Sequence, residues 1–298
     1  MKKMTAVMLV LAFLAAAPLA RAQAGAVPET EKEAAVRAAL DYSDGAYSGD
    51  AARMERAIHP DLNKVIFGRR PPMTGLMSRY STFSDLVELT RPALFFVEPE
   101  KRLTETAVLE ITEDVACLRV KTAQWCDYLQ LIKVNGQWKI INVLWTLGLS
   151  APAAAKVVPG FDAEKERPAA GQAALDFVEA RLAGDAARLE KVLHPETSQV
   201  TFLVAPKTSI GFVTRARYTG ILEPVKAKVG VVPETERAAE VRVLDLMDGL
   251  AFAVARTAAG AAYVQLQLMD GQWKAINVLV RPANNAFRQG PPPAPPKK

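Results

Sequence analysis

Apolar and polar positions follow one another along the chain with periods that predict a fixed series of elements. Residues 29–47 carry Val36, Ala39 and Leu40 at the spacing of an amphipathic helix. Asp50 is a candidate N-cap for a second, short helix, which we expect to end near Ile58 because the residue before Pro60 avoids the helical region. Later runs predict a third helix from Ser81 and five strands, at Val65–Phe67, Leu103–Ile111, Val115–Lys121, Cys126–Val134 and Gln137–Leu147. Helices that precede a run of antiparallel strands predict an α+β fold.

The same series occurs twice, with an offset of 135 residues. Residues 38–60 and 173–195 are identical at twelve of 23 positions, and residues 128–144 and 263–279 at eleven of 17. Because both blocks share one offset, the chain is predicted to contain two tandem copies of a whole domain, and the long period excludes a solenoid repeat. We expect the first domain at 28–148, an alanine- and proline-rich linker at 149–161, the second domain at 162–283, and a disordered proline-rich tail at 284–298.

The last two strands of each copy are joined at Asn135-Gly136 and Asp270-Gly271, which are strong hairpin signals because both central residues of a type I′ turn need a positive φ. A two-residue turn pairs Val134 with Gln137 and Gln130 with Ile141. One face then carries Leu129, Leu131, Trp138, Ile140, Asn142 and Leu144. The opposite face carries Tyr128, Gln130, Lys139 and Ile141. The first face is the more apolar, so we expect it to pack on the helices.

The first residues predict export. Lys2 and Lys3 precede an apolar run from Thr5 to Leu19, and Ala20-Arg21-Ala22 is a small-x-small cleavage site. We therefore expect residues 1–22 to be a signal peptide, removed before Gln23, and a periplasmic or secreted protein. The apolar run is too short for a membrane span, and no later stretch reaches about 18 consecutive apolar residues.

Charge argues against a nucleic-acid partner. The net charge of +5 falls to +2 when Lys2, Lys3 and Arg21 leave with the signal peptide. The tail holds three further basic residues, without which the two domains carry about −1. A surface that meets phosphates needs an excess of basic residues, so the class of nucleic-acid-binding proteins is excluded.

Both copies resemble the nuclear-transport-factor-2-like superfamily, and within it the branch labelled "putative lumazine-binding", which is related to SnoaL-like proteins. The residues that carry the resemblance are Tyr47-Ser48-Gly49-Asp50, His59-Pro60-Asp61, Asp127-Tyr128-Leu129 and the block from Asn135 to Asn142. The second copy has Leu182, Glu196 and Ala262 in place of Tyr47, Asp61 and Asp127. The resemblance implies two cone-shaped domains, each a curved antiparallel sheet packed on N-terminal helices, with a pocket at the open end. Relatives include isomerases, cyclases, dehydratases and binding modules, so the fold selects no chemistry.

His59 and His194 are the two histidines of the chain, at matching positions. Histidine transfers protons near neutral pH, and Asp61 could tune His59. Alternatively, each histidine interacts with the last carbonyl groups of the helix before it. Asp127 could act as an acid or base with a raised pKa in an apolar pocket, or it could be solvated at a strand end.

Candidate ligand-binding residues follow from the apolar sheet face and the first helix. Tyr42 and Tyr47 could line the cone or pack as core aromatics, and Leu129, Leu131 and Trp138 share the sheet face. Asn142 and Asn277 could orient a ligand in the pocket, or be satisfied by neighbouring backbone groups.

Cys117 and Cys126 are the two cysteines. They could form a disulfide if their strands turn near Lys121–Ala123, or remain two buried thiols. Two cysteines and two distant histidines make no metal-ligand cluster, and we expect no metal and no cofactor.

The sequence favours a binding protein with an apolar pocket for a small organic ligand in at least the first domain. An alternative is a cofactor-independent isomerase, dehydratase or hydrolase that uses His59 with Asp61 or Asp127. A third is a protein-interaction module. We expect the two domains to pair through the face that holds Tyr128, Gln130 and Ile141, and the second domain to be mainly structural because it lacks Tyr47 and Asp127.

Overall fold

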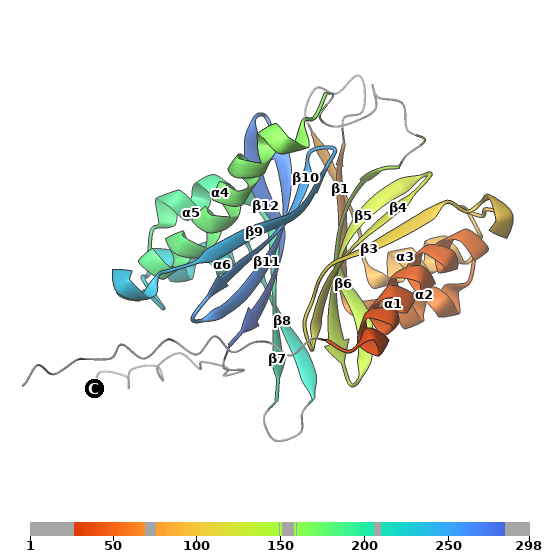
Figure 1. The fold of residues 1–298 in the computed structure, drawn as a ribbon, viewed down its shortest axis with the longest axis horizontal. Helices are drawn as coiled ribbons and strands as arrows, with labels where there is room; N and C mark the ends of the chain where they lie inside the picture. The colour runs from red at the N-terminus through yellow and green to blue at the C-terminus, as the bar shows by residue number, and fades with distance from the viewer. Residues whose placement is uncertain are drawn as a thin grey trace, which may run out of the picture.

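The computed structural model describes residues 27–68, 76–148, 150, 158, 160–205 and 210–283. The predicted signal peptide, the predicted tail and most of the predicted linker lie outside these residues. The described chain forms two α+β halves, each with a six-stranded sheet and helices packed on one side of it (Figure 1). This confirms the predicted fold class of two tandem domains.

The first half runs through α1 (Glu29–Ser48), α2 (Ala51–Ala57), β1 (Ile58–Gly68), β2 (Met77–Ser81), α3 (Phe83–Thr90), the 3-10 helix η1 (Pro99–Lys101), β3 (Thr104–Ile111), β4 (Val115–Thr122), β5 (Trp125–Val134) and β6 (Gln137–Leu147). The second half repeats this order as α4 (Ala163–Ala183), α5 (Ala186–Val192), β7 (Leu193–Val204), β8 (Gly211–Arg217), α6 (Tyr218–Lys226), the 3-10 helix η3 (Glu234–Glu236), β9 (Glu240–Met247), β10 (Leu250–Thr257), β11 (Gly260–Met269) and β12 (Gln272–Pro282). Within these described elements, no helix is long and apolar enough to cross a membrane.

The two sheets have the same strand order, β2-β1-β6-β5-β4-β3 and β8-β7-β12-β11-β10-β9. The first strand of each copy pairs in parallel with the last, and the other neighbours are antiparallel. The last strand of each domain thus lies beside the first, and each sheet packs one of its faces on the helices (Figure 1).

Local signals place the helices where the sequence predicts them. Gly49 ends α1 with a φ of 71°, a left-handed conformation that glycine adopts without steric cost. The Asp50 side chain then accepts a hydrogen bond from the backbone N–H of Arg53, as an N-cap does. The third helix is capped by Thr82, one residue after the predicted Ser81, through a capping box with Asp85.

The hairpin register departs from the predicted one. Val134 lies opposite Gln137 as expected, but a bulge between Gln130 and Leu131 places Gln130 opposite Asn142 rather than Ile141. One extra residue in a strand moves each later side chain to the other face of the sheet. Asn142 and Leu144 therefore face the second domain, not the helices, and the predicted face of these two residues was wrong.

The two sheets face each other between the outer helices (Figure 1). Gln130 Nε2 donates to the backbone oxygen of Tyr263 at 2.8 Å, and Gln265 Nε2 donates to the backbone oxygen of Tyr128 at 2.8 Å. The two glutamines are 135 residues apart, as are the two tyrosines. The contact is therefore isologous, as in a twofold dimer of identical subunits.

Charged residues also connect the two domains at the edge of the contact, through partners that differ between the copies. Asp245 accepts hydrogen bonds from Arg119 at 2.7 Å and from the Tyr128 hydroxyl at 3.0 Å. Glu110, its counterpart in the first domain, accepts from Arg256 at 2.6 Å and also pairs with Arg242.

One apolar cluster joins the two sheets. Its buried members from the first domain are Val65, Phe67, Val115, Cys117, Cys126, Tyr128, Ile132, Ile141 and Leu144. Those from the second are Val200, Phe202, Met247, Leu250, Phe252, Val254, Tyr263, Met269, Ile276 and Leu279.

Cys117 and Cys126 are both free thiols within this cluster. Cys126 lies opposite Lys121 and Cys117 opposite Gln130, so the two cysteines are four register positions apart. Four positions along a strand span about 13 Å, well beyond the separation that a disulfide bridges. The disulfide hypothesis was wrong because the β4–β5 turn comes one to two residues later than it required.

Candidate functional site

The first domain encloses a cavity of about 830 Å³ between its sheet and its helices. We call it the first-domain cavity. Its walls come from α1, α2, β1, β2, α3, the start of β5, the end of β6 and nearby connections. The residues that line it are Tyr42, Ala46, Met54, Lys64, Arg79, Tyr80, Ser81, Asp85, Leu86, Glu88, Leu89, Thr90, Phe95, Gln124, Trp125, Trp145 and Leu147.

A buried polar cluster lies at the inner side of this cavity. The Lys64 ammonium forms an ion pair with Asp127 at 3.0 Å and donates a hydrogen bond to the Tyr42 hydroxyl. Asp127 is completely buried, behind Lys64, and its Oδ2 has no hydrogen-bond partner among the described residues. Tyr42 and Lys64 thus present polar atoms to the cavity, and Asp127 supports Lys64 from behind.

Burial controls the proton affinity of this cluster. It raises the pKa of the Asp127 carboxyl, although the Lys64 charge acts in the opposite direction. It lowers the pKa of the Lys64 ammonium, which Asp127 partly offsets, and raises the pKa of the Tyr42 hydroxyl. Both charged groups are therefore displaced toward their neutral forms, as expected for an ion pair removed from water.

Aromatic rings form much of the remaining wall. Lys64 Nζ lies 4.6 Å from the centre of the Trp145 ring, and the Arg79 guanidinium lies 5.5 Å from the same ring. Trp125 packs at 5.0 Å against Tyr47 and at 5.8 Å against Phe95. Flat rings beside a few polar atoms are typical of a small-molecule site.

The remaining predicted ligand residues of the first domain lie in its core. Tyr47 is buried and donates from its hydroxyl to Gln124 at 2.6 Å, so it supports the cavity wall from behind. Leu129, Leu131 and Trp138 pack in the core cluster, and Trp138 Nε1 also donates to Glu31 at 3.1 Å. Of the residues predicted from the sequence, Tyr42 alone is among those that line the first-domain cavity.

Asn142 and Asn277 lie between the domains. Asn142 Nδ2 donates to Gln130 at 2.8 Å, and its Oδ1 accepts from Arg215 at 3.4 Å. Asn277 Nδ2 donates to Gln265 at 2.9 Å, and its Oδ1 accepts from Asn63 at 2.8 Å. Both amides are fully buried and have protein partners, so the hypothesis that they orient a ligand in the pocket was wrong.

His59 and Asp61 lie together, away from the first-domain cavity. His59 Nδ1 accepts a hydrogen bond from the Asp61 backbone N–H at 3.0 Å, within a strand irregularity between Ile58 and Asn63. His194 Nδ1 accepts from the Glu196 backbone N–H at 3.2 Å in the same way. Each histidine therefore stabilises a local turn. Neither histidine caps the helix before it, and His59 does not pair with Asp127.

The environment of both histidines favours the neutral ring. Burial lowers the pKa of His59, with Asp61 opposing the shift and Arg215 and Lys139 adding to it. Burial likewise lowers the pKa of His194. A ring nitrogen that accepts a backbone N–H must also be unprotonated, so hydrogen bonding and burial agree.

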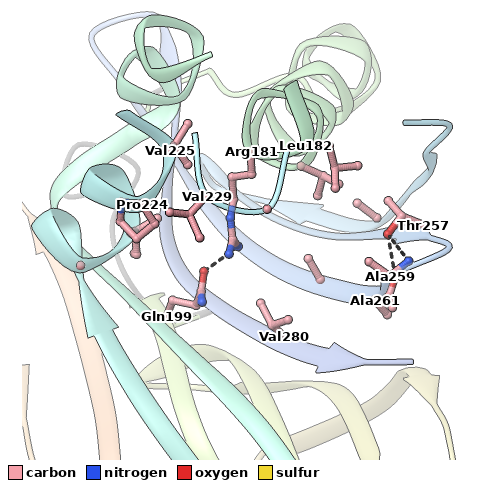
Figure 2. A pocket seen from close by; sticks show the side chains of 17 residues that line it. Arg181, Leu182, Gln199, Pro224, Val225, Val229, Thr257, Ala259, Ala261 and Val280 are labelled. Atoms are coloured by element: carbon pink, nitrogen blue, oxygen red, sulfur yellow. Dashed lines mark hydrogen bonds between the residues drawn. The ribbon is translucent and has the colours of Figure 1, made fainter. Parts of the chain in front are cut away.

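The second domain contains its own cavity, of about 230 Å³ (Figure 2). We call it the second-domain cavity. Its lining residues are Val178, Arg181, Leu182, Gln199, Gly220, Ile221, Pro224, Val225, Val229, Gly230, Ala255, Thr257, Ala259, Gly260, Ala261, Ala262 and Val280. Figure 2 shows Arg181 reaching from its helix toward Gln199, with apolar side chains around them.

Sequence reasoning missed Lys64, Trp125 and Trp145 in the first domain and Arg181 and Gln199 in the second. A signal existed for two of them. Lys64 alternates with Leu62 and Ile66 along its strand and so shares their face, and Arg181 lies four residues after Phe177 on the buried stripe of its helix. Charged residues at inward positions of apolar elements are the pattern that would have identified both.

Within the described residues, no group of three or more histidine, cysteine, aspartate or glutamate side chains is placed to hold a metal ion. The polar cluster at Lys64 offers one carboxylate, which is itself paired with an ammonium group.

Comparison with known proteins matches residues 30–146 to the family described as "Putative lumazine-binding". The resemblance predicted from the sequence is thereby confirmed for the first domain. No curated protein matches the chain.

Several solved structures are similar to part of the chain. An NTF2-like protein of unknown function from Silicibacter pomeroyi is 16% identical, with 41% of this chain and 99% of that chain covered and a TM-score of 0.34. A putative scytalone dehydratase from Novosphingobium aromaticivorans is 14% identical over 41% of this chain and 86% of that chain, with a TM-score of 0.31. A ketosteroid isomerase-like protein from Erwinia carotovora atroseptica is 17% identical over 41% of this chain and 98% of that chain, with a TM-score of 0.30.

Proposed function

We propose that this chain is a small-molecule-binding protein whose first-domain cavity accepts a flat, predominantly apolar and uncharged organic ligand. The observation that carries the proposal is the combination of an 830 Å³ cavity with the buried Lys64–Asp127–Tyr42 cluster at its inner side. Cavities that bind organic ligands have volumes of roughly 300–1,000 Å³ and a few polar groups within apolar walls.

The charges of the cluster indicate that the ligand is neutral. The positive charge of Lys64 is already balanced by Asp127 at 3.0 Å. An anionic ligand would have to compete with that carboxylate, and a cationic one would be repelled by Lys64. A carbonyl oxygen, by contrast, can accept a hydrogen bond from Lys64 without disturbing the ion pair.

The aromatic wall indicates a planar ligand. Trp145 and Trp125 offer ring faces and edges, on which planar ligand rings stack favourably. The family description names lumazine, which has two fused rings with carbonyl oxygens and therefore satisfies both criteria. We use it as the first probe in a panel of neutral bicyclic aromatic molecules.

Calorimetric titration of the purified protein with this panel tests the proposal. At least one member should bind, and Leu86→Trp should weaken its binding at least tenfold because the larger ring fills the cavity. Ile221→Trp is the matched control, since Ile221 is the counterpart of Leu86 and lines the second-domain cavity. It should leave the affinity unchanged. If no member binds, or if both variants lower the affinity equally, the proposal is wrong.

An enzymatic function would use the same cluster rather than His59. Neither His59 nor Asp61 lines the first-domain cavity, whereas Lys64 and Tyr42 do. Burial lowers the pKa of the Lys64 ammonium, which makes it easier for this group to give a proton to a bound substrate. This alternative requires that the protein converts a member of the panel to a product. It also requires that Lys64→Gln abolishes this turnover while the variant still binds the same molecule.

Two further parts of the proposal concern the whole chain. We propose that residues 1–22 direct export and that the mature protein begins at Gln23, which mass measurement of the exported protein would test. We also propose that the two domains remain paired in solution. The reciprocal hydrogen bonds of Gln130 and Gln265 and the shared apolar cluster support this pairing.

A further inference from the structure

The second-domain cavity contains a positive charge that no described carboxylate neutralises. Arg181 Nη1 donates to Gln199 Oε1 at 2.8 Å, and its guanidinium lies 5.3 Å from the centre of the Phe177 ring. Burial lowers the pKa of Arg181, and no neighbouring charge in the described chain contributes to the shift. Arg188, in the same domain, pairs with both Asp176 and Glu179.

The offset of 135 residues between the copies shows how this charge arises. Arg181 occupies the position of Ala46, and Gln199 that of Lys64. Ala262 occupies the position of Asp127. The cation has therefore moved from the first strand to the helix, and the carboxylate that would balance it is absent. The polar cluster of the first-domain cavity is a neutral ion pair, whereas Arg181 is the one charged residue among the described residues that line the second-domain cavity.

An unpaired charge in an apolar cavity is unfavourable unless something pairs with it. The walls around Arg181 are apolar, with Leu182, Val225 and Val280 among them (Figure 2). Ile221 also lines the cavity. Gln199 holds one nitrogen of the guanidinium and so orients the group. Arginine has five N–H donors in a planar fork that matches the two oxygens of a carboxylate.

We propose that the second-domain cavity binds a small organic monocarboxylate, with its carboxylate on Arg181 and its apolar body against Leu182, Ile221 and Val225. The volume of about 230 Å³ is smaller than that of the first-domain cavity and limits the ligand to about the size of a single ring. Inorganic phosphate would satisfy the charge but leave the apolar walls uncovered. The proposal rests on residues other than those of the proposed function and does not depend on it.

The test is calorimetric titration of the purified protein with benzoate, benzamide and inorganic phosphate. Benzoate should bind, and benzamide, which has the same shape without the charge, should bind at least tenfold more weakly. Arg181→Met should weaken benzoate binding at least tenfold, and Arg181→Lys should recover only part of the loss because lysine lacks the planar fork. Arg188→Met is the matched control and should leave benzoate binding unchanged.

Thermal unfolding separates a binding role from a structural one. Arg181→Met should not lower the midpoint temperature in the absence of ligand, because it removes an uncompensated charge. In the wild-type chain, benzoate should raise that midpoint by mass action, and in Arg181→Met it should not. The proposal is overturned if benzoate does not bind, if benzamide or Arg181→Met binds equally well, or if phosphate binds and benzoate does not.

Discussion

Single residues decide what each domain can bind. The folds of the two copies are equivalent, but the polar groups inside them differ. The differences include Ala46 against Arg181, Lys64 against Gln199 and Asp127 against Ala262, and the hydroxyls of Tyr42 and Tyr47 are absent from Phe177 and Leu182. The sequence identified Asp127 as one of three residues, with Tyr47 and Asp61, that distinguish the copies. It could not show that Lys64 is its partner, because the two residues are 63 positions apart and meet only when β1 lies beside β6.

The Lys64–Asp127 pair provides a prediction at this scale. Asp127→Ala should lower the free energy of unfolding by about 3–5 kcal/mol, since it leaves a buried ammonium group without its partner. Adding Lys64→Gln should restore most of that loss, because the double variant recreates the Gln199 and Ala262 arrangement of the second domain. Urea unfolding of the wild type, both single variants and the double variant measures the coupling. Additive effects would show that the two side chains do not interact.

At the scale of elements, the hydrophobic pattern predicts the helices and the strands β3 to β6 well. It identifies only Val65–Phe67 of the eleven-residue β1, and it misses β2 and the strand irregularities. The turn at Asn135-Gly136 has the predicted positive φ at both residues. The bulge beyond it leaves no mark in the sequence, because Ile140, Ile141 and Asn142 are compatible with either face until packing chooses one. For this reason the sequence placed Asn142 in the pocket, and the structure places it between the domains.

The turns at His59-Pro60-Asp61 and His194-Pro195-Glu196 provide a prediction about how the stability of the fold depends on pH. An unfolded histidine has a pKa of about 6.5, and burial lowers the pKa of His59 and His194 in the fold. Just below pH 6.5 the unfolded chain therefore binds more protons than the folded one, and stability should fall as the pH decreases from about 7.5 through 6.5. In the double variant His59→Asn/His194→Asn, the side-chain oxygen of each asparagine can still accept the hydrogen bond from the backbone N–H. Unlike histidine, asparagine has no proton to gain or lose in this pH range.

The midpoint temperature of this double variant should depend less on pH between about 5.5 and 7.5 than that of the wild type. Thermal unfolding followed by circular dichroism at several pH values measures the difference. An unchanged pH dependence would mean that other groups control acid stability.

At the scale of the whole molecule, the duplication supports the proposed pairing of the two domains as an internal dimer. The face with Tyr128, Gln130 and Ile141 contacts the second sheet, and each glutamine bonds the backbone of the opposite domain. Linkage in one chain keeps the two faces at a high effective concentration. The helices of both domains are thereby left on the outer sides of the molecule (Figure 1).

Solution scattering tests this arrangement. The wild-type chain should scatter as one compact particle rather than as two separate bodies on a linker. Gln130→Ala with Gln265→Ala removes both reciprocal hydrogen bonds and deprives the buried Asn142 and Asn277 amides of their glutamine acceptors, which should cost about 1–3 kcal/mol for each. Two separate bodies in the wild type would contradict the pairing.

The most direct test of the central claim is a crystal structure of the protein with a bound member of the neutral aromatic panel. The account predicts electron density within the first-domain cavity, with the ligand ring against Trp145 and an acceptor atom within hydrogen-bond distance of Lys64 Nζ. Density for the same ligand only outside this cavity, or a cavity filled by the protein's own side chains at saturating ligand, would contradict it.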